Sequence, residues 1–219
     1  MDILRLSALG GLLGLDGTAV GQFMVSRPLV AGVLTGWMSG DVGVGLAIGM
    51  LLELYLLVSV PSGGARFPEA ATATVVAVAC AAPFEGAGAV VLAVAVGLVW
   101  GQVGGASVDA GRHLNDRFVP EPGDAGDPAA RVTRVHLVAI LADFLRGATV
   151  TATGIVSGRF VVRSFVDRWP LDGSASMALL LIGGAVSAGI LLNDLGGFRR
   201  RKVWFTAGLA LGIVGSRFL

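Results

Sequence analysis

Apolar segments occupy most of this chain and are separated by short polar or glycine-containing breaks. They cover about residues 3–15, 28–38, 42–60, 70–83, 86–106, 135–157, 174–193 and 203–215. Several are shorter than the roughly 20 residues that a helix needs to cross a bilayer. Short, glycine-interrupted apolar segments are typical of re-entrant hairpins and broken helices. The pattern therefore predicts about five or six full crossings together with helical hairpins, and not eight regular spans.

One stretch of the chain is clearly hydrophilic. Residues 109–134 carry interspersed acids and arginines, and the sequence VPEPGDAGDPAA at their centre has the composition of a flexible linker. We expect one membrane domain over residues 1–219, in which a hydrophilic linker joins two halves. The N-terminal half, the linker and the C-terminal half are predicted at 1–107, 108–134 and 135–219.

The composition places the chain among integral membrane proteins. Hydrophobic residues make up 54% and charged residues only 14%, with a mean hydropathy of +0.80. The 34 glycines suit close packing of helix backbones in a membrane. The predicted fold class is an all-α integral membrane protein, with polytopic helices and re-entrant or broken helical hairpins. The N-terminal sequence has an acid at position 2 and no standard cleavage signal, so we expect it to be retained.

Several function classes are disfavoured by what the sequence contains. A net charge of +1 gives no basic field for nucleic acid. Cys80 is the only cysteine, and His113 and His136 have no metal-binding spacing, so we expect no metal and no cofactor. Motifs such as GxSxG, HExxH and GxxxxGK[ST] do not occur. The sequence therefore argues against an enzyme with covalent chemistry of its own.

Two cationic clusters bear on topology. The run FRRRK at 198–202 predicts a cytoplasmic loop, and a contact with anionic lipid is compatible with that placement. Arg159, Arg163 and Arg168 form a looser patch. If this patch is also cytoplasmic, residues 174–193 must form a hairpin or a return pair of half-helices.

Glu53 lies within an otherwise apolar stretch, residues 42–60. An acid at membrane depth costs roughly 2.5–3.5 kcal/mol on insertion scales. Such a group is usually paired, turned inward or placed along a polar pathway. The alternative is a structural carboxylate that accepts hydrogen bonds from neighbouring backbone or hydroxyl groups.

The few polar residues within the apolar segments suit the binding of a polyol or sugar. The carboxylates and the amide that could bind hydroxyl groups belong to Glu53, Glu69, Gln102 and Asp143. Trp37, Trp100 or Phe67 could provide a flat apolar face, although tryptophans near segment ends are commonly interface anchors. On a helix, His136, Asp143 and Arg146 lie broadly on one face. This stripe could bind substrate, relay protons or form a satisfied polar seam, and an Asp143–Arg146 pair fits each of these interpretations.

Residues 21–57 resemble the sugar-conducting IIC subunit of mannose/sorbose-type phosphotransferase systems. The matching positions are Asp16, Gln22-Phe23, Arg27-Pro28-Leu29, Gly40-Asp41, Gly49 and Glu53. Further similarity follows at Pro68-Glu69-Ala70 and Gly101-Gln102, and more loosely at His136 and Arg146. The family usually has Asp where this chain has Glu69.

The resemblance implies a multi-pass subunit of the bacterial cytoplasmic membrane that binds and translocates a sugar with a IID membrane partner. Soluble IIA and IIB proteins would carry the phosphoryl group, and IIB would phosphorylate the sugar. The family assembles as a trimer of IIC–IID pairs. By motif match, the leading sugar-binding candidates are Glu53, Glu69 and Gln102, followed by His136 and Asp143. Two alternatives stay open: a non-transporting scaffold or regulatory subunit, and an ion-coupled carrier using Glu53, Glu69 and His136.

Overall fold

The structure is a computed structural model that describes residues 2–57, 66–118 and 127–215. The helices in these ranges are α1 (Ile3–Thr18), α2 (Pro28–Ser39), α3 (Val42–Tyr55), α4 (Ala70–Ala81), α5 (Ala87–Asn115), α6 (Pro128–Phe165), α7 (Gly173–Asp194) and α8 (Gly197–Gly215). Two short 3-10 helices follow α5 and α6, and the described residues contain no strand. Each predicted apolar segment therefore corresponds to one helix, and the all-α fold is confirmed.

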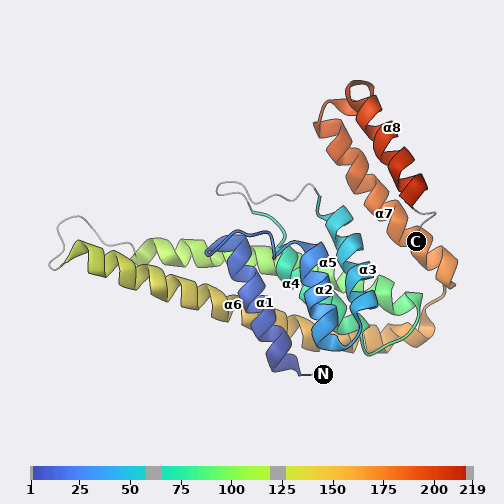
Figure 1. Cartoon of the computed structure of the whole chain (residues 1–219). Helices are drawn as coiled ribbons and strands as arrows, with labels where there is room; N and C mark the ends of the chain where they lie inside the picture. Colours follow the sequence, from blue (N-terminus) through green and yellow to red (C-terminus); the bar gives the residue numbers. More distant parts are fainter. Residues whose placement is uncertain (1, 58–65, 119–126, 216–219) are drawn as a thin grey trace.

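Helix α4 is the centre of the fold. All residues from Ala71 to Ala81 are buried, and α1, α2, α3, α5 and α6 all contact this helix (Figure 1). With 12 residues α4 is about 18 Å long, well short of the hydrocarbon core of a bilayer. A short helix surrounded by other helices is tolerated at membrane depth because its ends find partners within the protein. The N-terminal end of α4 therefore places backbone and side-chain polar groups inside the molecule.

Helices α2 and α3 form a tight helical hairpin. Gly40, with φ of 85°, makes the turn, and the Asp41 carboxylate caps α3 by accepting a hydrogen bond from the Val44 N–H at 2.9 Å. The two helices touch through glycines: a Cβ added at Gly45 would lie 2.3 Å from the carbonyl oxygen of Gly32. The predicted role of glycine in close backbone packing holds at this interface.

Three of the described helices are long and apolar enough to cross a membrane, judged by length and composition. They are α5, α6 and α7, whereas α2, α3 and α4 are shorter apolar helices. The short helices agree with the predicted broken hairpins. The expected number of about five or six crossings stays a prediction.

Helices α5 and α6 are long antiparallel neighbours that continue into the predicted linker (Figure 1). Helix α5 extends to Asn115 and α6 begins at Pro128, so both ends of the 108–134 stretch are helical. Charged residues at the ends of long helices have the same composition as a polar loop, which explains the difference. The central part of the predicted linker, residues 119–126, lies outside the described residues.

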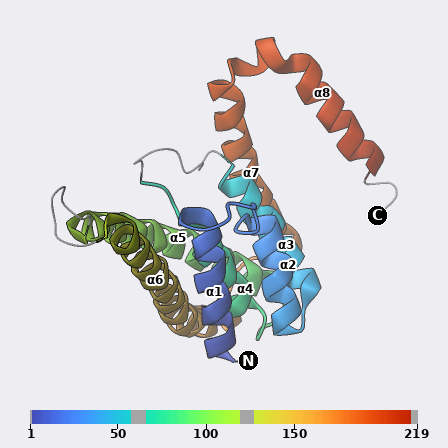
Figure 2. The same cartoon turned by 60° about the vertical axis from the view of Figure 1, so that its left-hand side comes forward.

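Helix α7 is continuous from Gly173 to Asp194, so residues 174–193 form no hairpin. The patch of Arg159, Arg163 and Arg168 precedes α7, and the FRRRK run follows it at the start of α8. The two cationic clusters therefore flank opposite ends of one span-length helix. Helix α7 contacts α3 and α5, whereas α8 and the adjoining end of α7 extend away from the other helices (Figure 2). Helix α8 is exposed along nearly its whole described length.

Candidate functional site

A buried carboxylate stands at the N-terminus of the central helix. Glu69 is the residue before α4 and is only 3% exposed. Its backbone N–H donates to the carbonyl oxygen of Gly101 at 2.8 Å, which fixes the start of α4 against α5. A negative charge at this end of a helix is favoured by the helix dipole.

Arg146 of α6 binds this carboxylate with both terminal nitrogens. Nη2 donates to Glu69 Oε1 at 2.7 Å, and Nη1 donates to Glu69 Oε2 at 3.2 Å. Thr72 Oγ1 donates to Glu69 Oε2 at 3.0 Å. A two-point arginine–carboxylate contact fixes the orientation of both groups. Both carboxylate oxygens of the acid at the N-terminus of α4 therefore accept hydrogen bonds.

The same arginine connects Glu69 to Asp143. Arg146 Nε donates to Asp143 Oδ1 at 2.6 Å, and Arg146 Nη1 donates to Ser107 Oγ of α5 at 2.8 Å. Thr18 Oγ1 of α1 donates to Asp143 Oδ2. We call Glu69, Asp143 and Arg146 the acidic cluster, because two carboxylates share one guanidinium and leave a net charge of −1. It joins four helices that are distant in sequence.

A second ion pair belongs to the α2–α3 hairpin. Arg27 Nε donates to Glu53 Oε1 at 2.8 Å, and Arg27 Nη2 donates to the same oxygen. Glu53 Oε2 accepts a hydrogen bond from the backbone N–H of Leu29 at 3.2 Å, so Glu53 also caps the start of α2. Glu53 is thus paired, as expected for an acid in an apolar segment, and part of its role is structural.

Asp16 accepts hydrogen bonds from the loop that joins α1 to α2 and ends at Arg27. This carboxylate is 6% exposed and accepts hydrogen bonds from the backbone N–H groups of Phe23 at 2.7 Å and Ser26 at 2.9 Å. The loop contains two non-glycine residues with positive φ, Gln22 at 55° and Met24 at 64°. Such backbone conformations persist only when the surroundings enforce them. The Asp16 carboxylate is the visible restraint on this loop.

A small cavity lies between the two ion-pair systems. Its volume is about 70 Å³, and it is lined by Gly14, Gly17, Thr18, Ser26, Arg27 and residues 67–71. Binding pockets for small molecules generally have volumes of about 300–1,000 Å³. The cavity is therefore smaller than such pockets, and its lining includes both Arg27 and Glu69.

The sequence of the chain matches a known protein family. A sequence profile described as the sorbose-specific IIC component of the phosphotransferase system matches residues 2–210. The chain belongs to this family. It is therefore a sugar-transport component of a mannose/sorbose-type phosphotransferase system and a multi-pass membrane protein. The search of curated proteins found no significant match.

Two solved structures share the fold of this IIC component. One is described as the structure of a membrane protein, with a TM-score of 0.71 and 18% identity, covering 99% of this chain and 91% of the other. The second is the mannose transporter ManYZ in complex with microcin E492. It has a TM-score of 0.50 and 20% identity, covering 99% of this chain and 90% of the other. At these identities the likeness concerns the fold alone.

The structure brings together three of the five site residues predicted for this IIC component. Glu69 lines the cavity, Asp143 is joined to it through Arg146, and Glu53 is paired with the cavity residue Arg27. By contrast, Gln102 on α5 and His136 on α6 are exposed and do not line the cavity. Periodicity identified polar positions on helices, but it could not say which of them face the centre of the fold.

Of the three aromatic residues considered for the apolar face of a sugar site, one lines the cavity. Phe67 lines the cavity, and the guanidinium carbon of Arg112 lies 5.6 Å from the centre of its ring. Trp100 Nε1 instead donates to the carbonyl oxygen of Val150 at 2.7 Å and joins α5 to α6. Trp37 is 72% exposed, which suits an interface anchor. Phe67 is thus the one of the three that borders the cavity.

Neither arginine was among the five predicted sugar-binding residues, although Arg146 was identified as part of a polar stripe that could bind substrate. The spacing of Asp143 and Arg146 did predict their pairing, which the structure confirms. The pairing of Arg146 with Glu69 and of Arg27 with Glu53 joins residues 77 and 26 positions apart. A signal was present, because two acids in apolar surroundings each require a cation nearby.

Proposed function

We propose that this IIC component binds its sugar in the cavity between Arg27 and Glu69 and moves it across the bacterial cytoplasmic membrane. The observation that supports this proposal is a cavity bordered by charged groups at the ends of short helices. Transporters commonly place substrates near the midplane, where discontinuous helices end. Glu53, Glu69 and Asp143 are the proposed site acids, whereas Gln102 and His136 stay sequence predictions.

The lining has the chemistry that a sugar requires. Carboxylate oxygens accept hydrogen bonds from sugar hydroxyl groups, and guanidinium N–H groups donate to them. The Phe67 ring gives the cavity an apolar wall. A Cβ added at Gly14 would lie 3.2 Å from Glu69 Oε1, so glycine lets α1 approach this carboxylate closely. Sugar hydroxyls would replace part of the hydrogen bonding that the ion pairs now satisfy.

The ion pairs also indicate how the cavity would open. The Arg27–Glu53 pair connects the start of α2 to α3, and the acidic cluster connects α4 to α6, with Ser107 of α5 and Thr18 of α1 attached. A movement of the α2–α3 hairpin against the other helices would therefore widen the cavity without breaking either ion pair. Rigid movement of one part of a transporter against another is a common route to alternating access.

The remaining parts of the proposal follow from family membership. A IID membrane subunit would complete the translocation unit, and a trimer of IIC–IID pairs is the proposed assembly. IIB would phosphorylate the sugar on the cytoplasmic side, after receiving the phosphoryl group from IIA. The exposed apolar surface of α7 and α8 offers an area for contact with lipid or with such a partner.

The test is sugar uptake by Glu53→Gln and Glu69→Gln, with Glu85→Gln as the control. Glu85 is an exposed residue in the turn between α4 and α5. We expect both site variants to insert and assemble but to take up sugar more slowly, while the control behaves as wild type. Normal uptake by both site variants would exclude these acids from the sugar site.

A non-transporting subunit is the second candidate function. The cavity is small, and the described carboxylates beside it are already paired, which a purely structural role would also produce. This candidate predicts that no sugar enters vesicles carrying the assembled complex.

A further inference from the structure

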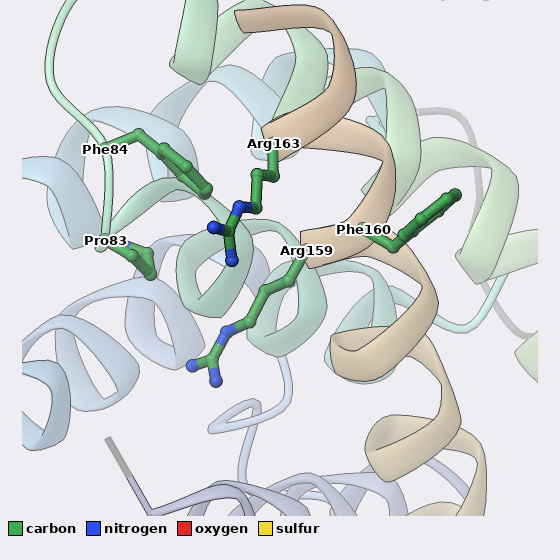
Figure 3. A pocket seen from close by; sticks show the side chains of 5 residues that line it. All are labelled: Pro83, Phe84, Arg159, Phe160 and Arg163. Carbon is green, nitrogen blue, oxygen red and sulfur yellow. The ribbon is translucent and has the colours of Figure 1, made fainter.

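A second and larger pocket lies at the opposite end of α4 from Glu69. Its volume is about 600 Å³, and it is lined by Pro83, Phe84, Arg159, Phe160 and Arg163. Pro83 and Phe84 belong to the turn between α4 and α5, and the other three residues lie on α6. Figure 3 shows both arginine side chains on the side of α6 that faces this turn, with the Arg163 guanidinium nearest to Pro83 and Phe84, whereas Phe160 points to the other side of the helix.

Arg159 has a hydrogen-bonding requirement that the described residues do not meet. Its Nε donates to the carbonyl oxygen of Ala79 at 3.1 Å, but its Nη2 is buried and has no partner. A buried polar group without a partner is costly, and such groups in native structures generally indicate a missing partner. The missing partner must be an acceptor, because an arginine has only donors.

Arg163 adds a second positive charge one helical turn further on. It is exposed, and within the described ranges neither Arg159 nor Arg163 forms an ion pair with a carboxylate. Glu85 lies in the facing turn but is itself exposed. Two guanidinium groups facing one pocket, with no acid between them, are suited to a bound anion such as phosphate.

The position of the pocket along α6 indicates where that anion comes from. Arg159 is the second residue after the apolar segment 135–157, and α6 is long and apolar enough to span. Trp169 follows the C-terminal end of α6 and precedes the start of α7. Arginine and tryptophan at the end of a spanning segment are typical of the headgroup level of a bilayer.

From these observations we infer that Arg159 and Arg163 form a binding site for the phosphate of an anionic phospholipid. The phosphate oxygens accept hydrogen bonds from Arg159 Nη2 and from the Arg163 guanidinium. Phe84 flanks the pocket on the side of the guanidinium groups and contacts the glycerol and the first acyl carbons. Basic pockets between membrane helices are known to hold anionic headgroups. The site is separate from the sugar cavity and does not depend on the proposed function.

The experiment is native mass spectrometry of the full-length chain in detergent, titrated with phosphatidylglycerol or phosphatidylcholine. The variants are Arg159→Gln and Arg163→Gln, and Arg168→Gln is the control because Arg168 is exposed and does not line the pocket. Arg159→Lys tests whether restored charge rescues binding. Arg163 is exposed, so its substitution leaves folding intact even if Arg159→Gln destabilises the chain.

We expect wild type to prefer phosphatidylglycerol, and each glutamine variant to bind it about fivefold more weakly. Arg168→Gln and Arg159→Lys should keep the wild-type affinity. Equal affinity in all variants would overturn the assignment. Displacement of the lipid by millimolar inorganic phosphate would instead assign the site to a free anion. Unchanged lipid binding combined with weaker association of a membrane partner would mean that the arginines bind a partner's carboxylate, which also contradicts the assignment.

Discussion

Replacing Arg146 by methionine should be more damaging than neutralising the acid that it binds. Arg146→Met keeps an unbranched apolar stem but removes the guanidinium and its charge, which leaves Glu69 and Asp143 as two uncompensated carboxylates. Glu69→Gln instead leaves the Arg146–Asp143 pair intact and electrically neutral. The net charge of the cluster thus changes from −1 to −2 in the first variant and to 0 in the second.

The magnitudes follow from burial. Glu69 is 3% exposed and the Arg146 side chain 13% exposed, so solvent compensates little for a lost partner. Removing one member of a buried ion pair typically costs about 3–5 kcal/mol in unfolding free energy. Weakening hydrogen bonds to a charged group costs about 1.5–3 kcal/mol, which is the expectation for Glu69→Gln. The double variant should be less destabilised than the sum of the two, because the residues contact each other.

The assay is reversible unfolding in mixed micelles of increasing SDS content, followed for wild type, both single variants and the double variant. Arg134→Met is the matched control, since Arg134 is an exposed residue of α6 whose loss should cost less than about 0.5 kcal/mol. Equal costs for Arg146→Met and Glu69→Gln, or strictly additive costs in the double variant, would refute the assigned coupling.

Two further predictions concern the hairpin and α7. Gly45→Val should destabilise the protein by about 1–3 kcal/mol, because the added atoms collide with the backbone of Gly32. Gly208→Val is the control and should be tolerated, because nothing lies within 4 Å of a Cβ at that position. Thermal unfolding of the two variants measures the difference. Asp172 caps α7, and the hydrogen bonds donated by the Ala175 N–H and the Ser174 hydroxyl lower the pKa of its carboxyl below the ordinary 3.8. The stabilisation that the Asp172 carboxylate gives to the protein is therefore present above pH 3.8 and is lost as the pH falls through the lower pKa of the folded state. A difference in stability between wild type and Asp172→Ala that persists unchanged at low pH would contradict this reasoning.

The helices could be predicted from the sequence because each apolar run coincides with one of them. Their ends were harder where charge begins: α5 continues to Asn115 because acids and arginines are compatible with a helix as well as with a loop. The short segment 70–83 looked like any other apolar run, yet it forms the central helix. Its position depends on contacts with five other helices, which no local pattern encodes.

The candidate site was predictable in part, for a related reason. Glu53 and Glu69 were identifiable because acids are rare and costly in apolar segments. Their partners come from remote parts of the chain, so only the Asp143–Arg146 pair, three residues apart, was visible from spacing. Gln102 and His136 have the same polar character as the cavity residues, but they lie on exposed faces of their helices.

The most direct test of the proposed function is uptake of radiolabelled hexoses and amino sugars into vesicles that carry this IIC component with its IID partner. Phosphoenolpyruvate and the general phosphotransferase proteins are either present or absent. The account predicts that phosphorylated sugar accumulates only when they are present, and that Glu69→Gln reduces the rate. Absence of uptake for every sugar, in vesicles where assembly of the complex has been confirmed, would contradict the account and favour a non-transporting subunit.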